Sequence, residues 1–154
     1  MSYKKADVAS RGQFSLSLRS QQKLLEVAKR KKIKSITVHS TCNRTEIYAL
    51  QTDASVLVDL LCAHSQGDQA LFSKIGYVLT KKVALQHLFR VGTGLDSQIL
   101  GDFEIIAQLK KSFVQSKKMA VLDPLFERLF NSVIQASKRI KNETQISSGT
   151  TSVP

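Results

Sequence analysis

Apolar residues recur along this chain with two different periods, and these periods mark out its predicted elements. Spacings of three and four residues predict helices, because such positions share one face of an α-helix. They occur over residues 20–32, 53–65, 80–91, 102–118 and from 124 onward. Alternation of apolar with polar residues predicts strands at 33–40 and 45–51, and a short third strand is expected at 77–79.

The two longer strands are separated only by Thr41-Cys42-Asn43-Arg44, a short link that contains Asn. Such a link between alternating segments predicts a β-hairpin. If residues 2–8 contribute a further strand, or if a strand precedes residue 14, the element order is βαββαβ, which is the ferredoxin-like pattern. We therefore expect an α+β fold, with a ferredoxin-like sandwich over residues 1–81 and a helical subdomain over 82–146.

Composition is that of a globular protein long enough to form a core: 154 residues, of which 42% are hydrophobic. No apolar run approaches the roughly 20 residues that a membrane-spanning helix needs. The chain has two cysteines and no secretory signal at its start. We expect a reduced, cytoplasmic protein that does not enter a membrane.

Positive charge is in excess, with 23 Lys and Arg against 12 Asp and Glu, a formal net charge of +11. It is clustered over residues 29–32, 110–118 and 138–141. A nucleic-acid surface is one interpretation, and cations placed at the negative ends of helix dipoles are the other. No zinc-finger or aromatic RNA-binding motif is present, so a nucleic acid would be bound through its phosphates and shape rather than its bases.

Cys42 is the strongest candidate for chemistry. A side chain in a hairpin link faces solvent, and a guanidinium nearby, here that of Arg44, favours thiolate over thiol. An inert, small core residue remains the alternative for Cys42 and is the expectation for Cys62, which lies on an apolar helix. His87 is either a half-buried histidine or a base or hydrogen-bond donor near a reacting carbonyl.

Cofactor motifs are missing from the sequence. The scattered cysteines and histidines lack metal-ligand spacing, so we predict no metal site. Neither GxGxxG nor GxxxxGK[ST] occurs, so no nucleotide site is visible. Residues 94–101 place small and polar side chains before a predicted helix, which suits either an anion site at the helix N-terminus or an ordinary connector.

Three blocks of sequence closely resemble glutamyl-tRNA reductase. They are Ser-Thr-Cys-Asn-Arg-Thr-Glu-Ile-Tyr at 40–48, the block that begins His-Leu-Phe-Arg-Val at 87 and ends at Gly101, and Lys-Asn-Glu-Thr at 141–144 followed by Ile146. The resemblance covers nearly the whole chain. It implies a catalytic domain over 1–150, with residues 147–154 beginning a linker to an NADPH-binding domain that this chain lacks. The family's first strand would precede Ser2.

The resemblance implies a mechanism in tetrapyrrole biosynthesis. The Cys42 thiolate attacks glutamyl-tRNA to form a glutamyl thioester, which NADPH then reduces to glutamate-1-semialdehyde, and His87 supports the reaction near the cysteine. The implied substrate contacts besides Cys42 are Thr41, Asn43, Arg44, Ser97, Asp102, Phe103, Glu104 and Gln108. Arg44 suits the substrate's side-chain carboxylate. Asp102-Phe103-Glu104 replaces the family's usual Glu-Pro-Gln.

The same resemblance implies partners. They are glutamyl-tRNA, a second copy of the full-length chain, and the glutamate-1-semialdehyde aminomutase that acts next. Because NADPH would be bound by the absent domain, this chain alone is expected to form the thioester without reducing it. The alternative is a basic tRNA-binding or regulatory module in which Cys42 is incidental.

Overall fold

A computed structural model describes residues 1–144 as a mixed α/β protein with seven helices and one two-stranded sheet in that range. The predicted α+β class is confirmed at this level. The residues fall into two compact units, 1–78 with 112–126 and 79–111 with 127 onward. Ile146 and the linker predicted at 147–154 lie outside the described residues.

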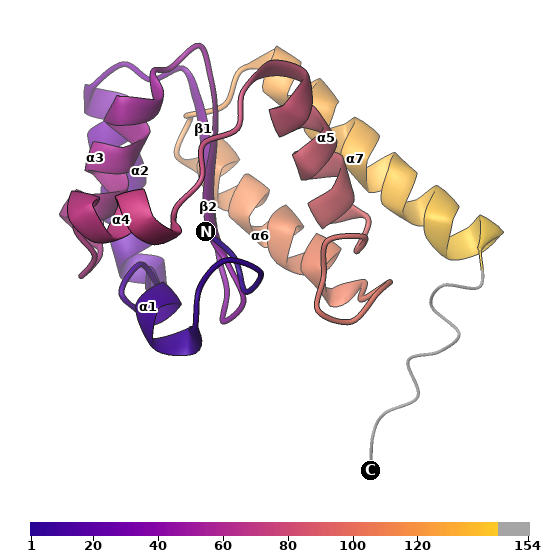
Figure 1. Cartoon of the computed structure of the whole chain (residues 1–154). Coiled ribbons are helices and arrows are strands. Elements are labelled where there is room, and N and C mark those ends of the chain that lie inside the picture. Colours follow the sequence, from indigo (N-terminus) through magenta and orange to yellow (C-terminus); the bar gives the residue numbers. More distant parts are fainter. Residues whose placement is uncertain (145–154) are drawn as a thin grey trace. The chain divides into compact units, whose positions relative to one another are not determined.

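The first unit is built on an antiparallel hairpin of β1 (Ser35–Ser40) and β2 (Thr45–Leu50), so the predicted hairpin is confirmed. Its helices are α1 (Val8–Gly12), α2 (Leu18–Arg30), α3 (Ala54–His64) and α4 (Gln69–Ile75). Figure 1 shows α2 and α3 on the same side of the hairpin. The predicted helices over 20–32 and 53–65 therefore form, with ends shifted by one or two residues.

The hairpin has one apolar face and one polar face. Ile36 and Val38 of β1 join the buried core formed with α2 and α3, and Ile47 and Ala49 pack against that core. Directly paired residues of an antiparallel sheet share a face, so the pairs Thr37↔Tyr48 and His39↔Glu46 place polar side chains on the other face. This polar face is also largely inaccessible, since Thr37 and His39 are each 1% exposed.

Three expectations for the first unit are wrong or incomplete. The strand predicted at 77–79 does not form: the Tyr77 hydroxyl instead bonds Glu46, and Val78 is 51% exposed. The short helices α1 and α4 were not predicted, because five and seven residues show too little periodicity, although Asp7 and Asp68 cap them. Consequently the described residues do not display βαββαβ order, and Ser2 makes only an isolated bridge to Arg44.

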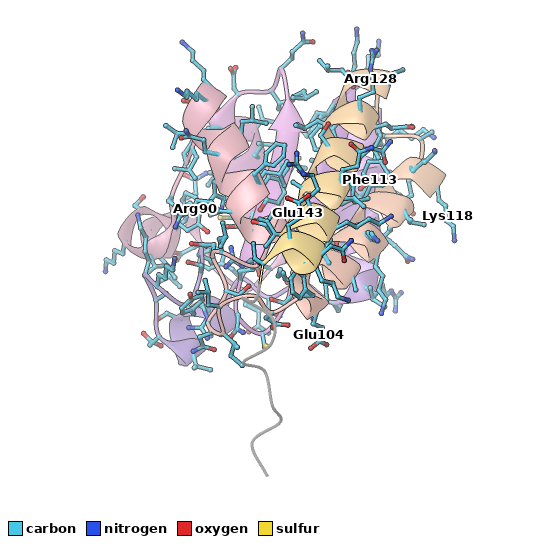
Figure 2. All side chains as sticks on the ribbon, turned by 90° about the vertical axis from the view of Figure 1, so that its right-hand side faces the viewer. Arg90, Glu104, Phe113, Lys118, Arg128 and Glu143 are labelled. Carbon is cyan, nitrogen blue, oxygen red and sulfur yellow. The ribbon has the colours of Figure 1, made fainter. Side chains whose placement is uncertain are left out.

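The second unit contains α5 (Lys81–Gly92), the first half of α6 (Glu104–Lys118) and most of α7 (Pro124–Glu143). These helices confirm the three predicted ones. Helices α5 and α7 approach closely at Gly92, where an added Cβ would overlap a methyl group of Val133. Figure 2 shows Arg128 and Glu143 toward opposite ends of α7.

The length and composition of the helices show whether any of them could span a membrane. Within residues 1–144, no helix combines the length and the apolar character needed to span a bilayer.

Candidate functional site

Cys42 lies in a tight loop that Thr41 organises. The Thr41 N–H donates to the Arg44 carbonyl at 2.8 Å, closing a loop in which Cys42 and Asn43 are the two connecting residues. The Thr41 hydroxyl oxygen accepts the N–H groups of Asn43 at 3.2 Å and Arg44 at 3.3 Å. The Cys42 side chain is exposed, as its place in the hairpin predicted. The loop thus presents a free thiol on a backbone held by several hydrogen bonds.

Arg11 of α1 contacts this loop, which sequence reasoning missed. Its Nη2 donates to the Cys42 carbonyl oxygen at 3.4 Å, and its Nη1 donates to the Ala6 carbonyl at 2.7 Å. Its Nε is buried and has no hydrogen-bond partner within the described chain. Arg11 therefore ties α1 to the cysteine loop across 31 positions, a distance over which hydropathy patterns carry no signal.

Arg44 lies in the interior rather than at the surface. Its Nη1 is 3.4 Å from Glu46 Oε1, and the two side chains are 1% and 5% exposed. The hydroxyls of Tyr48 and Tyr77 donate to the two oxygens of the same carboxylate. Burial and the Glu46 carboxylate raise the pKa of both phenols, so both remain protonated donors. From the sequence we expected the Arg44 guanidinium to lie beside Cys42. In the structure the Nη1 of Arg44 is turned toward Glu46 instead.

This buried polar cluster had a weak sequence signal. Arg44 and Glu46 are two residues apart, so they share the strand face that also carries Tyr48. Tyr77 could not be assigned to the cluster, because the segment that carries it has no regular structure.

His39 belongs to the same polar face and is buried opposite Glu46. Burial lowers its pKa to about 4, although the Glu46 carboxylate acts in the opposite direction. The ring is therefore neutral at pH 7, and its Nε2 has no partner among the described residues. His39 lies three residues before Cys42, but it is part of the interior rather than a solvent-facing base.

The second unit carries the other predicted site residues, beginning with a folded glycine loop. Gly94 adopts the left-handed conformation at φ +77°, and its carbonyl accepts the N–H groups of Ser97 at 3.4 Å and Gly101 at 3.2 Å. A Cβ at Gly94 would lie 3.0 Å from the Asp102 carbonyl oxygen. Glycine at this position thus allows the backbone at Asp102 to approach residue 94 closely.

The altered Asp102-Phe103-Glu104 segment opens α6. The Asp102 carboxylate accepts the Glu104 N–H at 2.9 Å, so it satisfies a backbone donor of the first helical turn. The Phe103 ring lies 5.6 Å from the Lys141 ammonium. Glu104 is exposed and projects outward at the end of α6 far from Lys118 (Figure 2). His87 on α5 and Gln108 on α6 are half-buried.

The predicted site residues therefore form two groups. Residues 41–44 lie in the first unit, and His87, Ser97, Asp102, Phe103, Glu104 and Gln108 lie in the second. In the first unit Thr41 hydrogen-bonds the cysteine loop, and in the second unit Ser97 and Asp102 each lie close to Gly94.

The described residues, 1–144, bear on whether this chain could hold a metal ion or a dinucleotide. No three His, Cys, Asp or Glu side chains gather there in a way that could hold a metal ion. The sheet in this range is a two-stranded antiparallel hairpin, whereas dinucleotides bind at a glycine-rich turn between a parallel strand and a helix. The described residues do not fit a nicotinamide dinucleotide.

Comparison with known proteins gives consistent matches. A family model described as "Glutamyl-tRNAGlu reductase, N-terminal domain" matches residues 1–144. A glutamyl-tRNA reductase of Christiangramia forsetii is 59% identical over 153 residues, which cover 99% of this chain and 37% of that relative. One of Flavobacterium psychrophilum is 54% identical with the same coverage. The solved glutamyl-tRNA reductase from Methanopyrus kandleri matches with a TM-score of 0.77 and 26% identity, over 96% of this chain and 34% of that one.

The fold and these matches define the class of the chain as a reductase-family N-terminal domain of mixed α/β structure. The chain belongs to the glutamyl-tRNA reductase family. It spans a little over a third of the length of the curated relatives it matches, 37% for the two described above.

Proposed function

We propose that this chain is the catalytic domain of a glutamyl-tRNA reductase, which acts in the first step of tetrapyrrole biosynthesis. The Cys42 thiolate attacks the ester carbonyl of glutamyl-tRNA, so a carbon–sulfur bond forms and the bond to the terminal ribose oxygen breaks. That oxygen takes up a proton and tRNA leaves, which divides one difficult step into two easier ones. The observation that carries the proposal is an exposed cysteine on an ordered hairpin loop in a chain of this family.

In this proposal Thr41, Asn43 and Arg44 line the substrate site with Cys42. The Arg44 guanidinium binds the substrate's side-chain carboxylate, for which its forked donors are well matched. Because Glu46 already accepts from Arg44 Nη1, the incoming carboxylate shares or replaces that partner. The Glu46 cluster would then set how far the guanidinium turns toward the substrate.

We assign the remaining contacts to the second unit. His87 supplies a proton or a hydrogen bond near the reacting carbonyl, and Ser97, Asp102, Phe103, Glu104 and Gln108 complete the substrate site. The closure of the 94–101 loop on Gly94 supports a joint role for Ser97 and Asp102. Glu104 adds a negative charge where the family usually has an amide. Its carboxylate should therefore face away from the side-chain carboxylate of the substrate's glutamyl group.

Reduction of the thioester is a separate matter, because the described residues do not fit NADPH. We propose that the chain alone forms the thioester and that reduction needs NADPH bound by another domain. From the family we propose that the full-length enzyme dimerises and that it delivers its product, glutamate-1-semialdehyde, to the aminomutase.

We also propose a domain organisation. The catalytic domain covers residues 1–150, in which residues 1–81 are ferredoxin-like and residues 82–146 are added helices, and residues 147–154 begin a linker. The bridge from Ser2 to Arg44 supports a strand beside β2.

The test is formation of a covalent adduct. The chain is incubated with glutamyl-tRNA radiolabelled in the amino acid, quenched in acid and digested, and the labelled peptide is identified by mass spectrometry. We expect the glutamyl group on Cys42, loss of the adduct in Cys42→Ser and retention in Cys62→Ser. If tRNA binds but the wild-type chain gives no adduct, the domain is a non-catalytic RNA-binding module instead.

A further inference from the structure

The positive charge is densest at the end of the hairpin opposite Cys42. Five of the six residues at 29–34 are basic: Lys29, Arg30, Lys31, Lys32 and Lys34. All five side chains are exposed, and within residues 1–144 none takes part in an ion pair, a side-chain hydrogen bond or a contact with an aromatic ring. Their charge is therefore available to an outside partner.

These cations border a groove, which we call the lysine groove. The groove has a volume of about 490 Å³, and its lining includes Lys31, Lys32, Lys34, residues 50–53 and Val56. Asp53 is the acidic side chain in this lining, so the three lysines leave it positive. Helix α3 begins in the groove, and its Val56 N–H donates to the Asp53 backbone carbonyl at 3.1 Å, while the Asp53 side chain makes no capping hydrogen bond. The positive end of the helix dipole adds to the attraction for an anion.

The helix dipole accounts for only part of the cluster. The α2 dipole favours Lys29 and Arg30 in its last turn, but this effect fades beyond the helix end. Lys32 and Lys34 lie past that end, so they need another explanation.

Lys32 also occupies an unfavourable backbone conformation. Its φ is +60°, a region that glycine adopts readily and that β-carbon-bearing residues mostly avoid. It follows the C-terminus of α2, where the Ile33 N–H bonds the Ala28 carbonyl and the Lys32 N–H bonds the Lys29 carbonyl. Glycine is the usual residue at this point of such a helix end. A lysine here gives up some backbone stability relative to glycine, as does Ala120 at the matching point past α6, and it places a further cation on the groove.

We propose that the lysine groove binds backbone phosphates of the tRNA whose aminoacylated end reacts at Cys42. This inference rests on the proposed function and adds the surface that holds the nucleic acid. The lysine groove and Cys42 lie at opposite ends of the hairpin. Six residues of strand at about 3.3 Å each separate them by roughly 20 Å. Figure 1 shows the connections into β1 and out of β2 at the end of the hairpin away from its loop. A free glutamyl group cannot span that length, but a polyanion can.

The geometry also suggests which part of the tRNA is bound. One strand of a nucleic-acid duplex advances about 3.4 Å per nucleotide, so roughly 20 Å corresponds to about six nucleotides. With the terminal ribose at Cys42, the groove would meet the acceptor stem just beyond the unpaired 3′ end. Contacts of this kind position the RNA without specifying its sequence.

Two substitutions test the groove, because each removes charge in a different way. Lys32→Gly removes a cation and relieves the positive φ, so lost binding cannot be attributed to unfolding. Lys34→Gln removes a cation and keeps a polar side chain that is one atom shorter. Lys74→Gln on α4 is the control, since it removes one exposed charge outside the groove. Dissociation constants for glutamyl-tRNA and for deacylated tRNA are measured between low and moderate salt.

We expect Lys32→Gly and Lys34→Gln each to weaken tRNA binding about fivefold and to lower the slope of log Kd against log salt by about 1. Lys74→Gln should leave both nearly unchanged. Equal effects of all three substitutions would overturn the proposal, because they would report net charge alone. The proposal would also be overturned if Lys32→Gly and Lys34→Gln bound tRNA normally but lost binding to phosphatidylserine vesicles. That result would make the groove a membrane-surface site.

These experiments can refute the proposal for the lysine groove and the proposed function independently of each other. A wild-type chain that gives the Cys42 adduct while Lys32→Gly binds tRNA normally overturns the groove and leaves the proposed function standing. Groove variants that lose tRNA binding, in a chain that never forms the adduct, support the groove and overturn the proposed function.

Discussion

Arg44 and Glu46 form a buried ion pair directly after the cysteine loop, with Nη1 and Oε1 3.4 Å apart. The two side chains project from the same face of the chain, while Cys42 is exposed two residues before Arg44. The carboxylate also accepts the hydroxyls of Tyr48 and Tyr77. The exposed Cys42 thus closely precedes a buried ion pair in the polar interior.

Removing the Glu46 carboxylate should be costly for this reason. In Glu46→Ala the Arg44 guanidinium keeps its burial and loses this counter-charge, so we expect the free energy of unfolding to fall by about 3–5 kcal/mol. Tyr77→Phe removes the hydroxyl that donates to Glu46 but leaves the ion pair in place, so it should cost less, about 1 kcal/mol. Urea denaturation of both variants measures the difference. A Glu46→Ala protein as stable as Tyr77→Phe would contradict a balanced ion pair.

His39 should make stability depend on pH in a defined window. Its folded pKa is about 4, against about 6.5 for an exposed histidine. Between these values the unfolded chain binds a proton that the folded chain excludes, so stability rises with pH there. The full contribution is present above pH 6.5 and is lost as pH falls toward 4. The shift corresponds to about 3 kcal/mol as an upper figure.

The measurement compares wild type with His39→Gln by urea denaturation from pH 4 to pH 7. Because Glu46 and Arg44 face His39 in both proteins, the difference between the two curves isolates the imidazole. We expect wild type to lose more stability than the variant on acidification. Parallel curves would show that the ring takes up its proton equally well in the folded chain.

The two cysteines should react with alkylating agents at different rates. Cys42 is exposed, whereas Cys62 on α3 is partly buried, and burial together with the Asp68 and Asp59 carboxylates raises the pKa of its thiol. Since the thiolate is the reacting form, iodoacetamide at pH 7 should modify Cys42 about tenfold faster. Peptide mapping against time gives both rates, with Cys42→Ser and Cys62→Ser as matched controls. Faster labelling of Cys62 would mean that the α3 surface opens readily.

The sequence predicted the hairpin, the place of Cys42 and the long helices, because each depends on local periodicity. Ile36 and Val38 alternate regardless of their partners, and the short link at 41–44 favours a solvent-facing Cys42. The burial of Arg44 and the contact from Arg11 depend on residues distant along the chain, Tyr77 and Cys42 respectively. A charged residue next to a reactive one suggested a surface pair, but strand geometry directs Arg44 to the face shared with Glu46.

Gly94 gives a test of the second group of site residues. Its positive φ and the 3.0 Å approach of an added Cβ to the Asp102 carbonyl oxygen mean that alanine would strain the loop. We expect Gly94→Ala to lower the free energy of unfolding by about 1–3 kcal/mol. Gly12→Ala is the matched control, because nothing lies within 4 Å of a Cβ there, and we expect it to be neutral or stabilising by up to about 1 kcal/mol.

The same pair of variants separates binding from nucleophilicity. If Ser97 and Asp102 contact the substrate, Gly94→Ala should slow adduct formation with glutamyl-tRNA about tenfold, while alkylation of Cys42 by iodoacetamide stays at the wild-type rate. Gly12→Ala should leave both rates unchanged. Normal adduct formation in a Gly94→Ala chain that has lost stability would show that the 94–101 loop is structural and that the substrate contacts lie elsewhere. Iodoacetamide does not need the substrate contacts, so its rate reports the reactivity of the Cys42 thiol itself, whereas adduct formation also reports binding of the glutamyl-tRNA.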